Sequence, residues 1–373
     1  MKEQEVLEKV KELAKRVADD ILAGRPPKIE FATRGSRNIE YDERRDLILI
    51  GERTTRRKLL DLGETRKFLQ TVKVLELAYR HLVDGRHSTI REVYYQLKYE
   101  IPGTDILVAQ KQAETDNVMF DLEVALGVLR EQLHFLPKRK GAVVGPITLI
   151  DRSIPGEVQE IDCTKAGRGG IAIPSTIEET EIYLQKDKED VLVLAIETGG
   201  MFERLLEERF WKAAYNKLGK DIILVLTEGQ PSRATRRLLH RLHAELGLEV
   251  YVFTDGDPWG FYIYSVIKRG SMRMSYLSEQ LAVPSARFVG MLTTDIYEYH
   301  LESRTEPLKK RDIKRLQEEL QYPWFKKPAW QHQLMLMLQI KKRIEQQALA
   351  AHGLEFVAKE YLPEKILENK VLD

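Results

Sequence analysis

The sequence predicts an α/β protein with a winged-helix-like first half and a Rossmann-like, mainly parallel sheet in its second half. In the second half, apolar runs near residues 190–197, 221–227 and 248–254 alternate with helical stretches. That alternation is typical of a parallel sheet wrapped by helices. In the first half, three helical patterns precede two short apolar segments around a Lys-Arg-Lys-Gly turn. This is the element order of a winged helix, in which the third helix enters the major groove of DNA.

Length and composition exclude several classes of protein. A chain of 373 residues, 43% of them hydrophobic, has room for about two or three domains. The single cysteine, Cys163, excludes a disulfide framework and a multi-cysteine zinc site, and fits a reducing, cytoplasmic compartment. No run of about 18 apolar residues occurs, so we expect no membrane-spanning helix. Because the net charge is only +1, bulk charge argues neither for nor against a nucleic-acid partner.

Residues 1–70 are predicted to form a helix and hairpin extension. Apolar residues recur on one stripe of the first helix, which covers its own domain or docks on a partner: Val6, Val10, Leu13, Val17 and Ile21. Residues 38–41 and 46–50 read as the two strands of a hairpin. The charged stretch that follows is either a solvated linker or an arm that contacts phosphate or a partner.

Residues 71–148 form the predicted winged-helix domain, and residues 149–373 form the sheet domain with its C-terminal helices. The turn after the third helix carries Lys138, Arg139 and Lys140, which we expect at the tip of the wing. A second basic group lies along one later helix: Arg233, Arg236, Arg237 and Arg241. Each group is either a solvated face or a surface for a phosphate backbone.

The helix after residue 88 contains two adjacent tyrosines with different predicted roles. Thr89 and Glu92 have the spacing of a capping box, which fixes where this helix begins. At about 100° per residue, Tyr94 then falls on the apolar stripe, whereas Tyr95 falls on a polar face with two cations, Arg91 and Lys98. A phenol beside positive charge suits attack on a phosphodiester. The alternative is a tyrosine that only extends its hydroxyl into water.

Carboxylates follow two of the predicted parallel strands. Glu197 comes directly after one apolar run, and Asp255 and Asp257 come directly after another. Ligands of open parallel sheets bind at the carboxyl ends of the strands, and hard oxygen ligands suit Mg²⁺. Asp257 precedes Pro258 and so also fits the N-cap of the next helix.

These motifs together resemble the family of DNA topoisomerase VI A subunits and the related meiotic double-strand-break proteins. STIREVYYQLK resembles the tyrosine motif of that family. IETGGMFERL and VFTDGDPWG resemble the two acidic motifs of its TOPRIM domain, and TEGQPSRATRRLLHRL lies where the family has a similar segment. The resemblance runs from about residue 75 to the C-terminus, with the motifs in the family's order.

The resemblance implies a function and a set of roles. Tyr95 would be the nucleophile that becomes linked to a 5′ phosphate, with Arg91 near the scissile phosphate. Glu197, Asp255 and Asp257 would hold Mg²⁺. The family implies a homodimer whose sites are shared between protomers, and an ATP-binding B subunit that completes an A2B2 heterotetramer acting on double-stranded DNA. The chain has no GxxxxGK[ST] phosphate loop, so we expect ATP to be bound by that partner. Lys98, Lys138, Arg139 and Lys140 are the expected DNA contacts.

Three alternatives remain open at the level of sequence. A TOPRIM nuclease or primase would use metal without a covalent tyrosine link. A winged-helix DNA-binding protein would need neither group. A meiotic-type protein of the same family would break DNA without resealing it.

Overall fold

The computed structural model describes residues 3–152, 154, 156–175, 177–212 and 216–373, which form two compact units. The first unit comprises Met1–Glu40 and Ile50–Lys138, and the second comprises Tyr41–Leu49 and Arg139–Asp373. The chain is therefore a mixed α/β protein, as predicted. The predicted sequence boundaries were 70 and 148, whereas the chain passes between the compact units at residues 40, 49 and 138.

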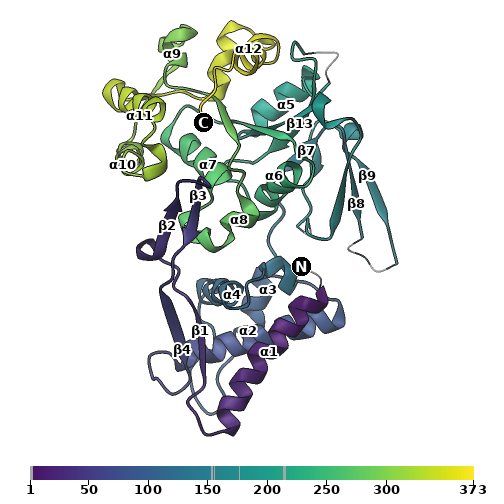
Figure 1. The fold of residues 1–373 in the computed structure, drawn as a ribbon, viewed down its shortest axis with the longest axis vertical. Coiled ribbons are helices and arrows are strands. Elements are labelled where there is room, and N and C mark those ends of the chain that lie inside the picture. Colours follow the sequence, from purple (N-terminus) through teal and green to yellow (C-terminus); the bar gives the residue numbers. More distant parts are fainter. Residues whose placement is uncertain (1–2, 153, 155, 176, 213–215) are drawn as a thin grey trace. The chain divides into compact units, whose positions relative to one another are not determined.

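Helices and short two-stranded sheets build the first unit (Figure 1). The helices are α1 (Glu3–Leu22), α2 (Thr65–Asp84), α3 (Ile90–Leu97) and α4 (Gln112–Leu126). β1 (Lys28–Ala32) pairs antiparallel with β4 (Thr54–Lys58). The apolar stripe of α1 is buried in the core of this unit from Val6 to Val17, while Ile21 is exposed. The first helix thus covers its own unit with this stripe.

The expected wing is not a hairpin. β6 (Phe135–Leu136) pairs in parallel with β5 (Ser88–Thr89) within the first unit, whereas β7 (Ala142–Val144) pairs antiparallel with β13 (Asp221–Leu226) within the second. Burial explains the difference, because all three residues of β7 lie inside the sheet of the second unit. Gly145 permits this close approach, since a Cβ there would lie 2.7 Å from the backbone of Ile223. Lys138 and Arg139 therefore lie in the connection between the units rather than at the tip of a wing.

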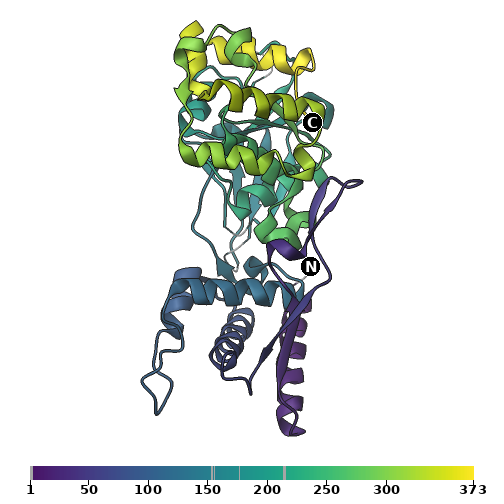
Figure 2. The ribbon, with the colours of Figure 1, turned by 90° about the vertical axis from the view of Figure 1, so that its left-hand side faces the viewer.

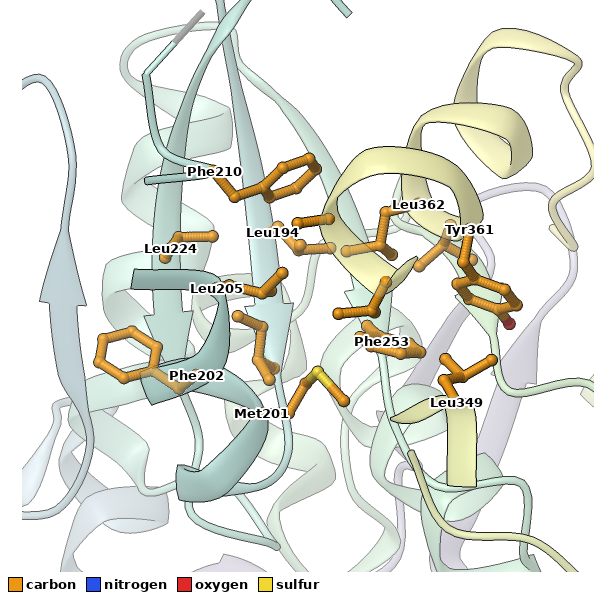
Figure 3. Packing of buried hydrophobic residues seen from close by; sticks show 14 of the residues in the cluster. Leu194, Met201, Phe202, Leu205, Phe210, Leu224, Phe253, Leu349, Tyr361 and Leu362 are labelled. Atoms are coloured by element: carbon orange, nitrogen blue, oxygen red, sulfur yellow. The ribbon is translucent and has the colours of Figure 1, made fainter. Parts of the chain in front are cut away.

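A six-stranded sheet forms the centre of the second unit. Its order is β10-β7-β13-β12-β14-β15, and its last four strands are parallel, including the three predicted from the apolar runs. The remaining bounds are β10 (Ile171–Ala172), β12 (Val191–Ile196), β14 (Glu249–Phe253) and β15 (Arg287–Gly290). Every residue of β12 and β13 is buried, which is typical of strands covered on both faces. Figure 3 shows the apolar side chains that pack on one of these faces.

Helices surround this sheet, and the second unit also contains a smaller antiparallel sheet. The helices are α5 (Gly199–Glu207), α6 (Arg233–Ala244), α7 (Pro258–Arg269), α8 (Ser278–Leu281), α9 (Asp295–Glu298), α10 (Lys310–Glu319), α11 (Pro328–Ile340) and α12 (Leu362–Leu367). The smaller sheet has the order β11-β8-β9, with β8 (Ile147–Asp151), β9 (Gln159–Asp162) and β11 (Thr180–Leu184). In Figure 2 the yellow-green α10 and α11 lie side by side, and α10 also packs against α7. Among the described residues, no helix combines the length and apolar character that crossing a membrane requires.

One of the predicted C-terminal helices, α11, ends well before the C-terminus of the chain. α11 stops at Ile340, and Lys341 adopts a left-handed conformation with a φ of 54°. Residues Lys342–Arg343 then form β17, which pairs with β16 (Glu306–Pro307). The residues that follow β17 contact the loop after β14 that carries Asp255 and Asp257.

The predicted hairpin is present as β2 (Ile39–Asp42) and β3 (Leu47–Ile50), and its tip belongs to the second unit. Asp46 at the tip accepts a hydrogen bond from the fully buried Arg269 at 2.6 Å and lies 3.7 Å from Lys268. The Tyr41 hydroxyl donates to the same carboxylate at 2.6 Å. The extension is therefore divided between the units rather than forming a separate domain.

Candidate active site

The tyrosine helix α3 begins with the capping box that the sequence predicts. The Thr89 hydroxyl accepts from the Glu92 N–H at 3.2 Å, and the Glu92 carboxylate accepts from the Thr89 N–H at 2.6 Å. Val93 and Leu97 are buried, and Tyr94 packs against the same core while its hydroxyl donates to the Gln110 carbonyl. The predicted helix phase is confirmed, because Tyr95 points away from this core and is 56% exposed.

Two cations lie beside the Tyr95 ring. The Arg91 guanidinium is 5.8 Å and the Lys98 ammonium 5.9 Å from the ring centre. A hydrogen bond from Arg91 and its charge lower the pKa of Tyr95, and the charge of Lys98 acts in the same direction. A lowered phenol pKa increases the fraction of phenolate, which is the nucleophilic form. The three side chains therefore share a face, as predicted.

A polar hollow of about 600 Å³ lies beside Tyr95 within the first unit. It is lined by Leu77, Arg80, His81, Asp84, Arg86, His87, Ser88, Glu92, Tyr95 and Gln96. Nδ1 of His81 and Oγ of Ser88 are buried without a hydrogen-bond partner among the described residues. Burial lowers the pKa of His81, and the neighbouring His134 and His87 add to this effect. The sequence analysis did not predict this hollow, although two of its polar residues, Arg86 and His87, directly precede the tyrosine motif.

The three predicted carboxylates meet at one edge of the parallel sheet. Glu197 follows β12, Asp255 and Asp257 follow the adjacent strand β14, and the Asp255 N–H donates to Oε2 of Glu197 at 3.0 Å. Asp257 caps α7 by accepting from the Gly260 N–H at 2.7 Å. Its other oxygen lies 3.3 Å from Arg343. The N-cap that the sequence allowed for Asp257 is therefore present.

The electrostatics of this cluster favour a bound cation. Burial raises the pKa of Glu197 to about 8, and repulsion from Asp255 adds to the rise. Burial raises the pKa of Asp255 to about 7, although a hydrogen bond from the Gln346 N–H opposes the rise. Burial also raises the pKa of Asp257, against the Gly260 N–H and Arg343. Carboxylates that resist carrying charge together are stabilised in the ionised form by a divalent metal.

The donor set fits Mg²⁺. Glu197 and Asp255 each accept one backbone N–H, at Oε2 and Oδ1 respectively. Among the described residues, hydrogen bonds to these two side chains are made at Oε2 of Glu197 and Oδ1 of Asp255, not at Oε1 or Oδ2. Hard, open oxygen ligands that leave room for waters and phosphate are the preferred environment of Mg²⁺. Glu197 and Asp255 thus offer free oxygens, whereas both oxygens of Asp257 are already engaged.

The arginines of α6 do not form the exposed basic face that the sequence suggested. Of the arginines on α6, Arg233 and Arg236 are buried, and Arg237 forms an ion pair with Glu178. Arg241 donates to two backbone carbonyls. These side chains are thus held within the unit rather than forming an exposed basic face. Lys140 donates to the Gln230 carbonyl at 2.7 Å, while Lys138 and Arg139 are exposed.

Family models match three consecutive parts of the chain. The model described as "Type IIB DNA topoisomerase" matches residues 66–135, which include Arg91 and Tyr95. The model described as "All-beta domain in DNA topoisomerase VI alpha subunit" matches residues 139–186. The model of the Toprim domain of Spo11 and of the topoisomerase 6 A subunit matches residues 192–366, which include all three carboxylates.

Curated relatives cover the whole chain. The A subunit of type 2 DNA topoisomerase 6 from Pyrococcus horikoshii is 46% identical over 380 residues, which cover 99% of this chain and 96% of the relative. The A subunits of the same name from Methanocaldococcus jannaschii and Halobacterium salinarum are 42% and 40% identical, over 97% and 99% of this chain and 94% and 98% of those relatives. This chain belongs to the A-subunit family of DNA topoisomerase VI. It is therefore part of a DNA topoisomerase and carries a Toprim domain, as the motifs predicted.

We predict that Arg91 controls the ionisation of Tyr95. Replacing Arg91 with Gln removes both the hydrogen bond and the charge that lower the phenol's pKa, so the pKa of Tyr95 should rise toward the usual value of about 10. NMR titration of ¹³C-labelled tyrosine, assigned with Tyr95→Phe, measures the change. The matched variant Lys98→Gln removes only a charge and should raise the pKa less. An unchanged titration in Arg91→Gln would contradict this account.

Proposed function

We propose that this chain is the DNA-cleaving and rejoining subunit of an ATP-dependent type IIB topoisomerase. Tyr95 attacks a phosphodiester of double-stranded DNA and forms a transient 5′-phosphotyrosyl link. The observation that carries the proposal is the exposed Tyr95 phenol, whose pKa is lowered by Arg91. The carboxylates of Glu197 and Asp255, which follow β12 and β14, are the proposed metal ligands for the same reaction.

The cleavage step follows from the groups around Tyr95. The Tyr95 oxygen forms a bond to phosphorus, the bond from phosphorus to the 3′ oxygen breaks, and that oxygen leaves as a 3′ hydroxyl after taking up a proton. Arg91 and Lys98 lie where their charge stabilises the phenolate and the negative phosphate. Glu197 and Asp255, with Asp257 beside them, would hold Mg²⁺, which supplies further charge stabilisation at the phosphate and the leaving oxygen. Because the phosphotyrosine conserves the bond energy, attack by the 3′ hydroxyl reseals the strand.

The assembly that we propose is a homodimer joined by an ATP-binding B subunit in an A2B2 heterotetramer. The relatives' names identify them as the A subunits of their enzymes. Two strands of a duplex need two nucleophiles, and twofold symmetry supplies them from two copies of one chain. In such an enzyme, cleavage of both strands opens one duplex for the passage of another. Lys138 and Arg139, which are exposed, join Lys98 as proposed DNA contacts.

The first prediction of this proposal concerns the nucleophile. Tyr95→Phe should fold and bind DNA, yet leave no protein covalently attached to DNA after denaturation, because the attacking oxygen is missing. The control Tyr94→Phe loses only a hydrogen bond to Gln110, worth about 1 kcal/mol, and should keep most of the adduct. The measurement is the protein–DNA band on a denaturing gel. Cleavage without any adduct in the unmodified protein would instead indicate a TOPRIM nuclease.

The second prediction concerns the metal. Glu197→Ala or Asp255→Ala should reduce cleavage by at least about 100-fold while DNA binding survives, and EDTA should have the same effect on the unmodified protein. Asp257→Asn should be milder, since asparagine keeps an oxygen for the Gly260 N–H. Glu203→Ala is the matched control, because Glu203 is an exposed carboxylate on the adjoining helix α5. Full cleavage in EDTA would refute the metal's role.

The third prediction concerns sharing of the site between protomers. Tyr95 and Glu197 belong to different compact units, so one protomer can supply the tyrosine and its partner the carboxylates. A mixed dimer of one Tyr95→Phe chain and one Glu197→Ala chain then has one site with both lesions and one with neither. It should nick a single strand, which a supercoiled plasmid reports as an open circle. A mixed dimer with no nicking activity would show that each site is built within one chain or that the two sites act only together.

A further inference from the structure

The segment after β17 pairs edge to edge with the acidic loop that follows β14. Ile344 and Gly256 exchange two backbone hydrogen bonds, with N···O distances of 2.8 and 3.1 Å. Gly256 is the residue between Asp255 and Asp257, so this pairing is centred on the acidic motif. A Cβ on Gly256 would lie 2.6 Å from the Ile344 side chain. The absence of a side chain there is what lets the two backbones meet.

The residues on either side of this pairing contact the two aspartates. On one side, the Arg343 guanidinium lies 3.3 Å from Oδ2 of Asp257. On the other side, the Gln346 N–H donates to Oδ1 of Asp255 at 2.9 Å. Arg343 is in turn paired with Glu306, which holds the guanidinium from its other side. The register of one backbone pairing therefore sets the contacts to both carboxylates.

Gln346 extends the same network to the glutamate motif. Its side chain is fully buried, and Oε1 accepts from the Thr198 hydroxyl at 2.9 Å. Thr198 directly follows Glu197, and its hydroxyl is not used to cap α5. Gln346 thus joins the loop that carries Glu197 to the loop that carries Asp255.

We propose that residues 343–346 are a positioning element for the metal-binding carboxylates, with the Gln346 N–H as its principal contact. The inference rests on the metal site proposed above. A backbone N–H on Oδ1 restricts the rotation of the Asp255 carboxylate and leaves Oδ2 available as a ligand. Partners of this kind, which bind a ligand rather than the metal, typically change metal affinity about 10- to 100-fold.

One backbone N–H can be removed here with a matched control. Gln346 is the first residue of the helical turn Gln346–His352, and the preceding Glu345 is extended, with φ −93° and ψ 152°. Proline is favoured at that first helical position and requires an extended residue before it. Gln346→Pro removes the side chain and the N–H, whereas Gln346→Ala removes the side chain alone. The difference between the two variants therefore isolates the N–H.

The readout is the affinity for Mn²⁺, used in place of Mg²⁺ and followed by the EPR signal of the free ion, without DNA. Gln346→Pro should bind Mn²⁺ about 10-fold more weakly than Gln346→Ala, while the melting temperatures of the two metal-free variants stay close. A purely structural role would change the melting temperature without separating the affinities. Equal Mn²⁺ affinities in the two folded variants overturn the proposal.

A second variant covers the case in which Gln346→Pro does not fold. Thr198→Val removes the hydroxyl that holds the Gln346 side chain but keeps the shape of residue 198, and it should weaken Mn²⁺ binding severalfold. Unchanged affinity in Thr198→Val would then overturn the proposal. Asp255→Asn separates this proposal from the function on which it rests. If Asp255→Asn binds Mn²⁺ as well as the unmodified protein, the metal site itself is wrong, and the positioning role falls with it.

Discussion

The parallel pairing of β12 with β14 is the constraint on which the candidate metal site depends. Ile196 lies opposite Phe253 in this pairing, and the N–H of Glu197 continues it by donating to the Phe253 carbonyl. Both strands are buried along almost their whole length. A slip of one residue would turn every side chain to the opposite face of the sheet. Burial of the apolar strand residues thus fixes the register of β12 and β14, and with it the positions of Glu197 and Asp255 at the strand ends.

This placement buries two carboxylates close together, and burial disfavours their charged forms. Burial raises the pKa of both Glu197 and Asp255, and the charge of Asp255 raises the pKa of Glu197 further. Buried carboxylates without a cationic partner are weak contributors to stability, and apolar replacements of similar volume are often as stable or more so. A cluster of this kind is best explained by a ligand that neutralises it. Tyr95 shows the opposite arrangement, since it is exposed and its pKa is lowered by a neighbouring cation.

Local signals predicted much of the site, and long-range pairing accounts for what the sequence did not reveal. The capping box at Thr89 set the helix phase and so distinguished Tyr95 from Tyr94, and the rule that ligands gather at strand ends grouped the carboxylates. The prediction of a wing was wrong because β7 pairs with β13, about 80 residues away in the chain. The contacts of Arg343 and Gln346 with the loop that carries Asp255 and Asp257 were not predicted either, because those residues are also far apart in the sequence. The arginines of α6 were misjudged because long aliphatic stems allow charged heads to be held within a fold.

The two halves of the proposed chemistry are structurally independent, and this follows from how each is held. The orientation of Tyr95 is set by a capping box and by packing of Val93 and Leu97, all within the first unit. The carboxylates are set by the sheet and by residues 343–346, all within the second. Effects of substitutions at separate, unlinked sites are generally additive, so a lesion in one half should leave the geometry of the other half intact.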